Sequence, residues 1–147
     1  VFEKVLVAYD GRTQSQHALR AAIEVAVRFG STLTIATVSP GSEEAVDPRL
    51  AGLLPVGDDE RPLGTLLEEG RALALEKGIR SADVVFLRGE VPEAILRFLA
   101  KHPHDLLVVG TRGLPRAHRL LLGSVSSTLV NTAPCPVLVL RAPRRRA

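Results

Sequence analysis

At 147 residues, 46% of them apolar, the chain is long enough to bury the core of one domain, and none of its apolar runs approaches the length of a membrane span. The net charge of +3 is unevenly placed, because residues 1–100 carry 11 basic and 15 acidic groups, whereas residues 101–147 carry eight basic groups and one acidic group. We therefore expect one domain over residues 1–142 with a basic tail at 143–147, no membrane partner, and a C-terminal part that attracts polyanions.

The N-terminal half alternates apolar runs with a helical stripe. Val5–Tyr9 is a short, unbroken apolar run, which predicts a strand buried on both faces. Residues 14–29 place apolar side chains at helical spacing and predict a helix, and Leu33–Val38 predicts a second strand. Residues 39–61 are rich in proline, glycine and acidic side chains. So long an irregular connection in a compact domain is usually a lid, a binding loop or a disordered segment.

The C-terminal half continues the alternation of strands and helices. In chain order, the pattern predicts a helix from Pro62 to Gly78, a strand at Asp83–Leu87, a helix from Val91 to before Pro103, a strand at Leu106–Val109, a helix at 124–132 and a strand at Pro136–Leu140.

Five predicted strands alternating with four helices indicate an α/β fold, an open, doubly wound, parallel five-stranded sheet of Rossmann-like type. Right-handed crossovers place helices on both faces of such a sheet. Ligands bind beyond the carboxyl ends of its strands, where the strand order reverses. The predicted carboxyl ends carry Asp10, Val38, Arg88 and Gly110.

The strand that ends at Gly110 leads into a stretch typical of phosphate binding. Glycines follow at 110, 113 and 123, and a helix is predicted to begin at Ser124. Free backbone N–H groups, a helix dipole and missing Cβ atoms together form a phosphate cradle. Two other interpretations stay open, because glycines also serve turn geometry and a serine can cap a helix without any ligand.

Three further features also have two interpretations each. Asp10 precedes a glycine, so it is either a turn-forming residue or a ligand at the binding edge. The loop arginines at 112, 116 and 119 are either solvated charges or a phosphate clamp. The terminal arginines 144–146 are typical of a solvated tail, and we expect no nucleic-acid partner because no aromatic residues interleave with them.

Cellular location is indicated by the cysteine count and by the first residues. The single cysteine, Cys135, has no partner for a disulfide within the chain, which is typical of a reducing compartment. Val5–Ala8 follows Glu3 and Lys4 as a strand-like run and lacks the pattern of a secretion signal. We therefore expect a cytoplasmic protein.

The spacing Gly110-x2-Gly113-x9-Gly123-Ser124 resembles that of the ATP-binding universal stress protein family. Asp105-Leu-Leu-Val-Val-Gly before it is similar to the family's pattern, as are Gly123-Ser-Val-Ser and Ala133-Pro-Cys-Pro-Val-Leu-Val-Leu after the loop. Val5-Leu-Val-Ala-Tyr-Asp-Gly resembles the family's first strand and its aspartate. The resemblance extends over essentially the whole chain.

The resemblance implies an adenine-nucleotide fold with strand order 3-2-1-4-5, ATP with Mg²⁺ or Mn²⁺ as ligands, and a homodimer whose last strands meet edge to edge. It implies that Asp10 lies near the ribose and the phosphate-bound metal, that Val38 contacts adenine through its backbone, and that the glycines and serines hold ribose and phosphates. The expected ligand-binding residues are Ala8, Asp10, Val38, Val109, Gly110, Arg112, Gly113, Gly123, Ser124, Val125 and Ser126. Arg12 departs from the family, whose members often have Ser or Thr there.

We therefore expect an ATP-binding universal stress protein that acts as a nucleotide-dependent switch toward a protein partner. No P-loop pattern is present, and no catalytic set assembles at the binding edge, so we expect at most slow ATP hydrolysis. One alternative is an interaction module of the same fold without nucleotide. The other is a nucleotidyl-transfer enzyme of related fold, whose His-x-Gly-His and Ser-Gly-Gly-x-Asp-Ser signatures are missing here.

Overall fold

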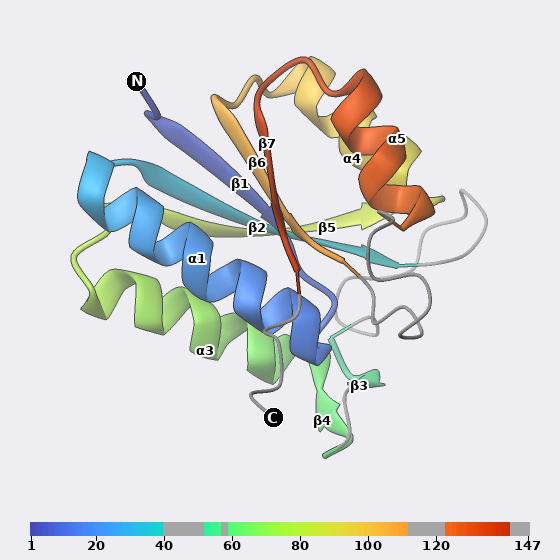
Figure 1. Ribbon diagram of the computed structural model, residues 1–147. Coiled ribbons are helices and arrows are strands. Elements are labelled where there is room, and N and C mark those ends of the chain that lie inside the picture. Colours follow the sequence, from blue (N-terminus) through green and yellow to red (C-terminus); the bar gives the residue numbers. More distant parts are fainter. Residues whose placement is uncertain (40–51, 57–58, 112–122, 142–147) are drawn as a thin grey trace, which may run out of the picture.

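A five-stranded sheet lies between two layers of helices (Figure 1). The computed structural model describes residues 1–39, 52–56, 59–111 and 123–141. The strands of the sheet are β1 (Lys4–Ala8), β2 (Thr32–Ser39), β5 (Ala82–Arg88), β6 (Leu106–Gly110) and β7 (Val137–Leu140). The helices of the described residues are α1 (Thr13–Phe29), α3 (Leu63–Glu76), α4 (Val91–Lys101) and α5 (Ser124–Thr132). None of these helices is both long and apolar enough to cross a membrane.

The strands lie in the order β5-β2-β1-β6-β7, and every neighbouring pair is parallel. Counted along the chain, these five strands have the order 3-2-1-4-5. The predicted doubly wound α/β sheet is therefore confirmed. The order reverses between β1 and β6, and Figure 1 shows α1 and α3 on one face of the sheet with α4 and α5 on the other.

The two central strands send alternate side chains into two separate cores. In β1, Val5 and Val7 are fully buried on the α1 and α3 side, whereas Leu6 is fully buried on the α4 and α5 side. In β6, Val108 and Leu107 divide in the same way. A strand that buries both faces needs an unbroken apolar run, which is the pattern that identified these strands in the sequence.

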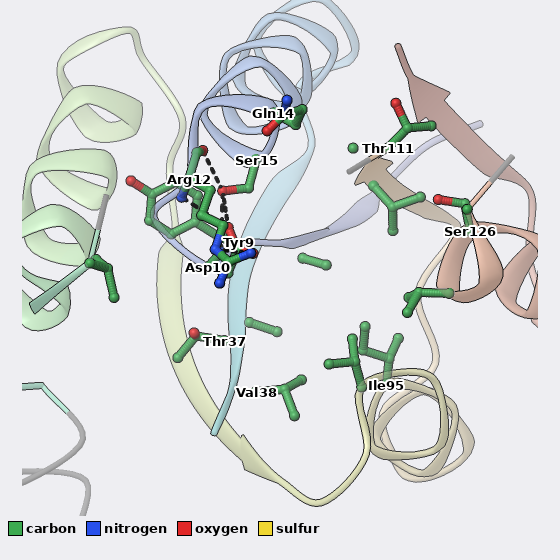
Figure 2. Close-up of a pocket in the computed structure, with 18 of the residues that line it drawn as sticks. Tyr9, Asp10, Arg12, Gln14, Ser15, Thr37, Val38, Ile95, Thr111 and Ser126 are labelled. Carbon is green, nitrogen blue, oxygen red and sulfur yellow. Dashed lines mark hydrogen bonds and ion pairs between the residues drawn. The ribbon is translucent and has the colours of Figure 1, made fainter. Parts of the chain in front are cut away.

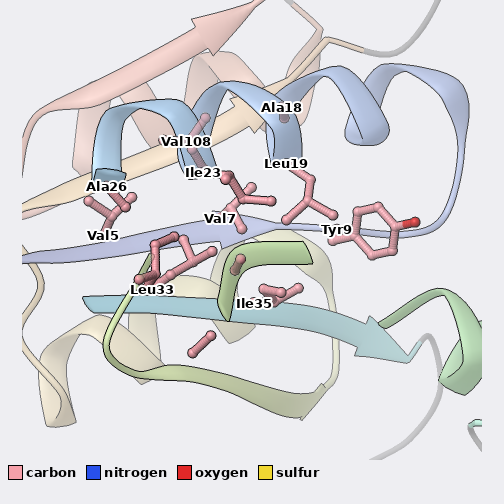
Figure 3. Close-up of a cluster of buried hydrophobic side chains, with 14 of the residues drawn as sticks. Val5, Val7, Tyr9, Ala18, Leu19, Ile23, Ala26, Leu33, Ile35 and Val108 are labelled. Atoms are coloured by element: carbon pink, nitrogen blue, oxygen red, sulfur yellow. The ribbon is translucent and has the colours of Figure 1, made fainter. Parts of the chain in front are cut away.

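Helix α1 packs its apolar stripe flat against the sheet. Ala18, Ala22 and Ala26 recur every four residues and are buried, so small side chains let the helix approach the strands closely. Figure 3 shows Leu19 and Ile23 from the same stripe above Val7 of β1. This packing fixes the start of α1 close to the carboxyl end of β1.

A short antiparallel hairpin lies within the segment that was predicted to be irregular. Its strands are β3 (Pro55–Val56) and β4 (Arg61–Pro62). The hairpin is tied to the start of α3, because the N–H of Leu63 donates to the Leu54 carbonyl at 2.9 Å and that of Gly64 donates to the Gly52 carbonyl at 2.8 Å. Two-residue strands have no periodicity, which is why the sequence pattern missed them. Residues 40–51 and 57–58 of this segment lie outside the described residues.

Gly110, at the end of β6, allows α1 to approach the sheet. A Cβ atom at this position would lie 2.6 Å from the carbonyl oxygen of Gln14 and 2.9 Å from its carbonyl carbon. These are backbone atoms of the first turn of α1, so relieving the clash requires the helix to move. The fold itself therefore requires glycine here, whether or not a ligand also does.

The same substitution at two glycines tests this packing. A Cβ at Gly123 meets no atom of the described residues within 4 Å, and serine is favoured at its helix N-cap position. We expect Gly110→Ser to lower the free energy of unfolding by about 1–3 kcal/mol through overpacking, and Gly123→Ser to change it by only about a few tenths of a kcal/mol. Urea denaturation measures both, and equal losses in the two variants would contradict the explanation.

Candidate functional site

A cavity of about 490 Å³ lies at the carboxyl ends of β1, β2 and β6, where the strand order reverses. The turn after β1, the starts of α1 and α5, helix α4 and the β3–β4 hairpin also contribute to its walls (Figure 2). Its volume is in the range of small-molecule sites, and its position is where doubly wound sheets bind ligands.

Nine of the eleven residues expected from the sequence line this one cavity. Arg112 and Gly113 lie outside the described residues, as do Arg116 and Arg119. That the nine residues bind a ligand stays a prediction, although segments far apart in the chain bring them together. They are Ala8, Asp10, Val38, Val109, Gly110, Gly123, Ser124, Val125 and Ser126.

The turn after β1 is fixed by hydrogen bonds to the Asp10 carboxylate. Its Oδ1 accepts the backbone N–H of Arg12 at 2.9 Å and the hydroxyl of Ser15 at 2.8 Å, and the Ser15 Oγ accepts the N–H of Asp10 at 3.2 Å. The other oxygen, Oδ2, lies 4.0 Å from Nε of Arg12. Asp10 therefore serves as a turn former, as the sequence allowed, and also presents its carboxylate at the cavity.

Gly11 completes this turn and packs it against the hairpin. Its φ of 83° lies in the left-handed region, which glycine adopts without strain. A Cβ there would lie 2.5 Å from Cγ2 of Val56, so the turn and the hairpin are in close contact. The side-chain amide of Gln16 donates to the Gly11 carbonyl at 3.2 Å. The turn is thus held both by α1 and by the hairpin.

Tyr9 forms part of the same wall and was not among the expected residues. Only 4% of its surface is exposed, yet the residue lines the cavity. Burial raises the pKa of its phenol, and the negative charges of Asp10 and Glu69 raise it further. The phenol therefore stays neutral at physiological pH, and Figure 2 shows its oxygen directed toward α3.

The start of α5 forms another part of the wall. Gly123 is its N-cap residue and makes no side-chain hydrogen bond to cap the helix, so Ser124 is not the cap that one interpretation of the sequence assigned. The N–H groups of Ser124, Val125 and Ser126 are in the first turn, where a helix supplies no acceptors of its own. All three residues line the cavity, and Figure 2 shows Ser126 with its hydroxyl toward it.

Strand β2 extends beyond β1 at this edge. The β1–β2 pairing ends at Ala8 opposite Ala36, where the N–H of Tyr9 donates to the Ala36 carbonyl at 2.8 Å, whereas β5 accompanies β2 as far as Ser39. Hydrogen-bonding groups alternate in direction along a strand, so Val38 directs its N–H and C=O to the same side as Ala36. That side is the space left by the end of β1.

Apolar side chains surround this exposed strand edge, and several were missed in the sequence. Phe86 lies on β5, while Val91 and Ile95 lie on α4. The strand order implied by the resemblance places the end of β5, and the start of α4 that follows it, beside the end of β2. That order was sufficient to predict that these three residues lie near the cavity. The contribution of Leu54 and Val56 was not predictable, because it depends on how the hairpin docks.

The described residues do not fit a metal ion held by the protein. Asp10 is the only acidic residue among those described as lining the cavity, and no group of three or more His, Cys, Asp or Glu in the described part of the chain is suited to hold a metal. Mg²⁺ and Mn²⁺ prefer carboxylate oxygens. Here, Oδ1 of Asp10 already accepts two hydrogen bonds and Oδ2 faces the Arg12 guanidinium.

Comparisons with known proteins agree with this fold. YxiE, a universal stress protein of Bacillus subtilis, is 34% identical in an alignment 151 residues long, which covers 96% of this chain and all of that protein. The structure of UspA from Lactobacillus plantarum matches with a TM-score of 0.75 and 28% identity, covering 95% of this chain and 98% of that one. A universal stress protein in complex with cAMP also matches with a TM-score of 0.75, at 26% identity and with coverage of 95% and 97%.

The sequence model of the universal stress protein family matches residues 2–141, from before β1 to beyond β7. This match includes every strand of the sheet and every segment described as lining the cavity. The chain therefore belongs to the universal stress protein family.

Proposed function

We propose that this protein binds an adenine nucleotide, ATP, in the cavity at the carboxyl ends of β1, β2 and β6. The observation that carries the proposal is that one cavity joins two unlike walls. Within the part of the chain that the structure describes, one wall offers a strand edge that β1 leaves unpaired among apolar side chains, and the other offers the start of a helix without a side-chain cap. A nucleotide has the same division into a flat, largely apolar base and an anionic phosphate group.

The adenine base would lie against the Val38 edge. A strand N–H and C=O that point in the same direction can donate to one ring nitrogen and accept from the exocyclic amino group of adenine. Phe86 and Ile95 supply apolar surface beside this edge. This arrangement supports the role that the resemblance implied for Val38, and it requires only backbone groups, so the valine side chain itself is not essential for it.

The phosphates would lie at the start of α5. Its first N–H groups lack a side-chain cap, and the helix dipole favours negative charge at this end. Gly123 leaves open space there, since a Cβ would meet no atom of the described residues within 4 Å. Glycine is therefore not required at 123 by packing within the described residues, unlike at 110, and a closely approaching ligand supplies a reason for it.

The similar universal stress protein solved with cAMP supports an adenine nucleotide as the ligand class. The choice of ATP follows the resemblance to the ATP-binding members of the family. The expected Mg²⁺ or Mn²⁺ at Asp10 is not carried into this proposal, because Oδ1 already accepts two hydrogen bonds and Oδ2 lies 4.0 Å from the positively charged Arg12 side chain.

We further propose that bound nucleotide acts as a switch through the β3–β4 hairpin. Leu54 lines the cavity and is also 47% exposed, and its neighbour Leu53 is 69% exposed. A ligand that contacts the inner side of the hairpin would thus change the conformation of the exposed apolar side chains on its outer side, a surface suited to a protein partner.

The proposed setting is the cytoplasm, where the free Cys135 thiol would stay reduced. Its pKa is raised by burial and further by Asp105.

ATP binding should stabilise the folded protein. Ligand at about a hundredfold excess over Kd adds about 2.7 kcal/mol, which corresponds to a rise of about 5–10 °C in Tm for a chain of this size. Gly123→Val should abolish most of this rise, because the branched side chain enters the open space at the start of α5. Differential scanning fluorimetry measures each variant against its own unliganded Tm.

Ser127→Val is the matched control, since Ser127 lies on α5 but does not line the cavity. This variant should keep the full shift. An unchanged Tm of the wild-type protein at millimolar ATP would overturn the proposed function, and a full shift in Gly123→Val would overturn the placement of the phosphates.

We also propose a homodimer through the edge of β7. Within the described residues this strand pairs only with β6. The Pro136 carbonyl accepts from Leu107 of β6 and the Leu140 carbonyl accepts from Thr111, just after β6. The N–H and C=O of Val139 therefore point outward, available to a second copy. This edge is the one that the resemblance implied.

Replacing the outward donor of β7 tests the dimer. Val139→Pro removes one outward N–H without removing a hydrogen bond to β6, so it should convert a dimer into a monomer in analytical ultracentrifugation. Val139→Thr keeps the N–H and should stay dimeric. A wild-type protein that sediments as a monomer at high micromolar concentration would contradict the proposal.

A further inference from the structure

We infer that Arg12 supplies the positive charge that the bound phosphates require, so that this protein binds its nucleotide without a divalent metal ion. This inference rests on the proposed nucleotide-binding function. It concerns the residue at which the sequence departs from the family pattern, two positions after the aspartate of the first turn.

The charges at the cavity give the first reason. Among the described residues that line it, Arg12 is the only basic side chain and Asp10 is the only acidic one. These two charges cancel, yet a nucleoside triphosphate brings several negative charges into the site. The start of α5 contributes only about half an elementary charge. A further cation is needed beside the phosphates, and Arg12 is the one that the described wall contains.

The state of Asp10 gives the second reason. A metal ion bound there would have to compete with the Arg12 backbone N–H and the Ser15 hydroxyl for Oδ1, and with the Arg12 guanidinium for Oδ2. Ser15 is itself 8% exposed and is held in the first turn of α1, where its hydroxyl lies within hydrogen-bond distance of Oδ1 of Asp10 and, at 2.9 Å, of the Arg12 carbonyl. The Asp10 side chain is 44% exposed and solvent reaches it, but a divalent ion at Oδ2 would lie beside the positive guanidinium of Arg12 and be repelled by it.

Arg12 is anchored through its backbone, and its guanidinium is still available to a ligand. Its backbone is fixed by the Asp10 hydrogen bond at the start of α1, while 64% of the side chain is exposed. The ion pair involves Nε at 4.0 Å, and a guanidinium has five N–H donors in a planar fork. The terminal N–H groups are suited to bidentate contact with phosphate oxygens. Figure 2 shows Arg12 and Asp10 together at the cavity.

The experiment compares ATP affinity in EDTA and in Mg²⁺ by isothermal titration calorimetry. For the wild-type protein, Kd should differ by less than about threefold between the two conditions. Arg12→Ser should bind about tenfold or more weakly in EDTA, because a charged hydrogen bond to phosphate is lost, and should recover most of this loss in Mg²⁺. Serine is a favoured N-cap residue, so this variant should fold at least as well as the wild type.

Two further variants complete the design. Arg28→Ser removes an arginine from the last turn of α1, outside the cavity, and should behave like the wild type in both conditions. Arg12→Lys keeps the charge but loses the bidentate geometry, so in EDTA it should bind more tightly than Arg12→Ser and less tightly than the wild type.

Three results separate the possibilities. A wild-type Kd that is weakened about tenfold or more by EDTA would overturn the inference while leaving the proposed function intact. Arg12→Ser with wild-type affinity in EDTA would do the same. If the wild-type protein binds no ATP in either condition, then the proposed function fails and the inference fails with it.

Discussion

The structure depends on the burial of β1 and β6 on both faces. Because Leu6 and Leu107 face one helical layer while Val7 and Val108 face the other, neither strand has a side on which a ligand can lie. The open positions are at the carboxyl ends, where the strand order reverses and the chain leaves toward α1 on one face and toward α5 on the other. The cavity is thus a consequence of sheet topology, and its chemistry comes from the few residues at the strand ends.

Two glycines of the same motif have different physical origins. Gly110 is required by the backbone of α1, whose first turn would clash with any Cβ. Gly123 has no such neighbour among the described residues, so packing within them does not account for its lack of a side chain. A glycine pattern read from sequence does not separate these two cases, and only the first is a property of the fold. The ligand argument is therefore stronger at Gly123 than at Gly110.

Much of the fold was predictable because continuous apolar runs are typical of strands buried on both faces, and the resemblance supplied their order. The same order predicted that Asp10, Val38 and Gly110 meet, since each lies at a strand end or just beyond one. Sequence reasoning missed the β3–β4 hairpin, because two-residue strands have no period and their position depends on contact between Gly11 and Val56. The predicted start of the last helix at Ser124 is confirmed, but the open alternative that Ser124 is the cap is not, because Gly123 holds the N-cap position.

The two ends of the cavity lie on elements that are separate in the chain, and a nucleotide is the ligand that would join them. An NMR titration of ¹⁵N-labelled protein with ATP tests this most directly. If a nucleotide spans the cavity, the amide signals of Val38 and Ser126 will shift together with one dissociation constant, and the hairpin-tethered amides of Leu63 and Gly64 will follow them. Shifts confined to one end, or to the opposite edge around Asp105, would contradict nucleotide binding at this site.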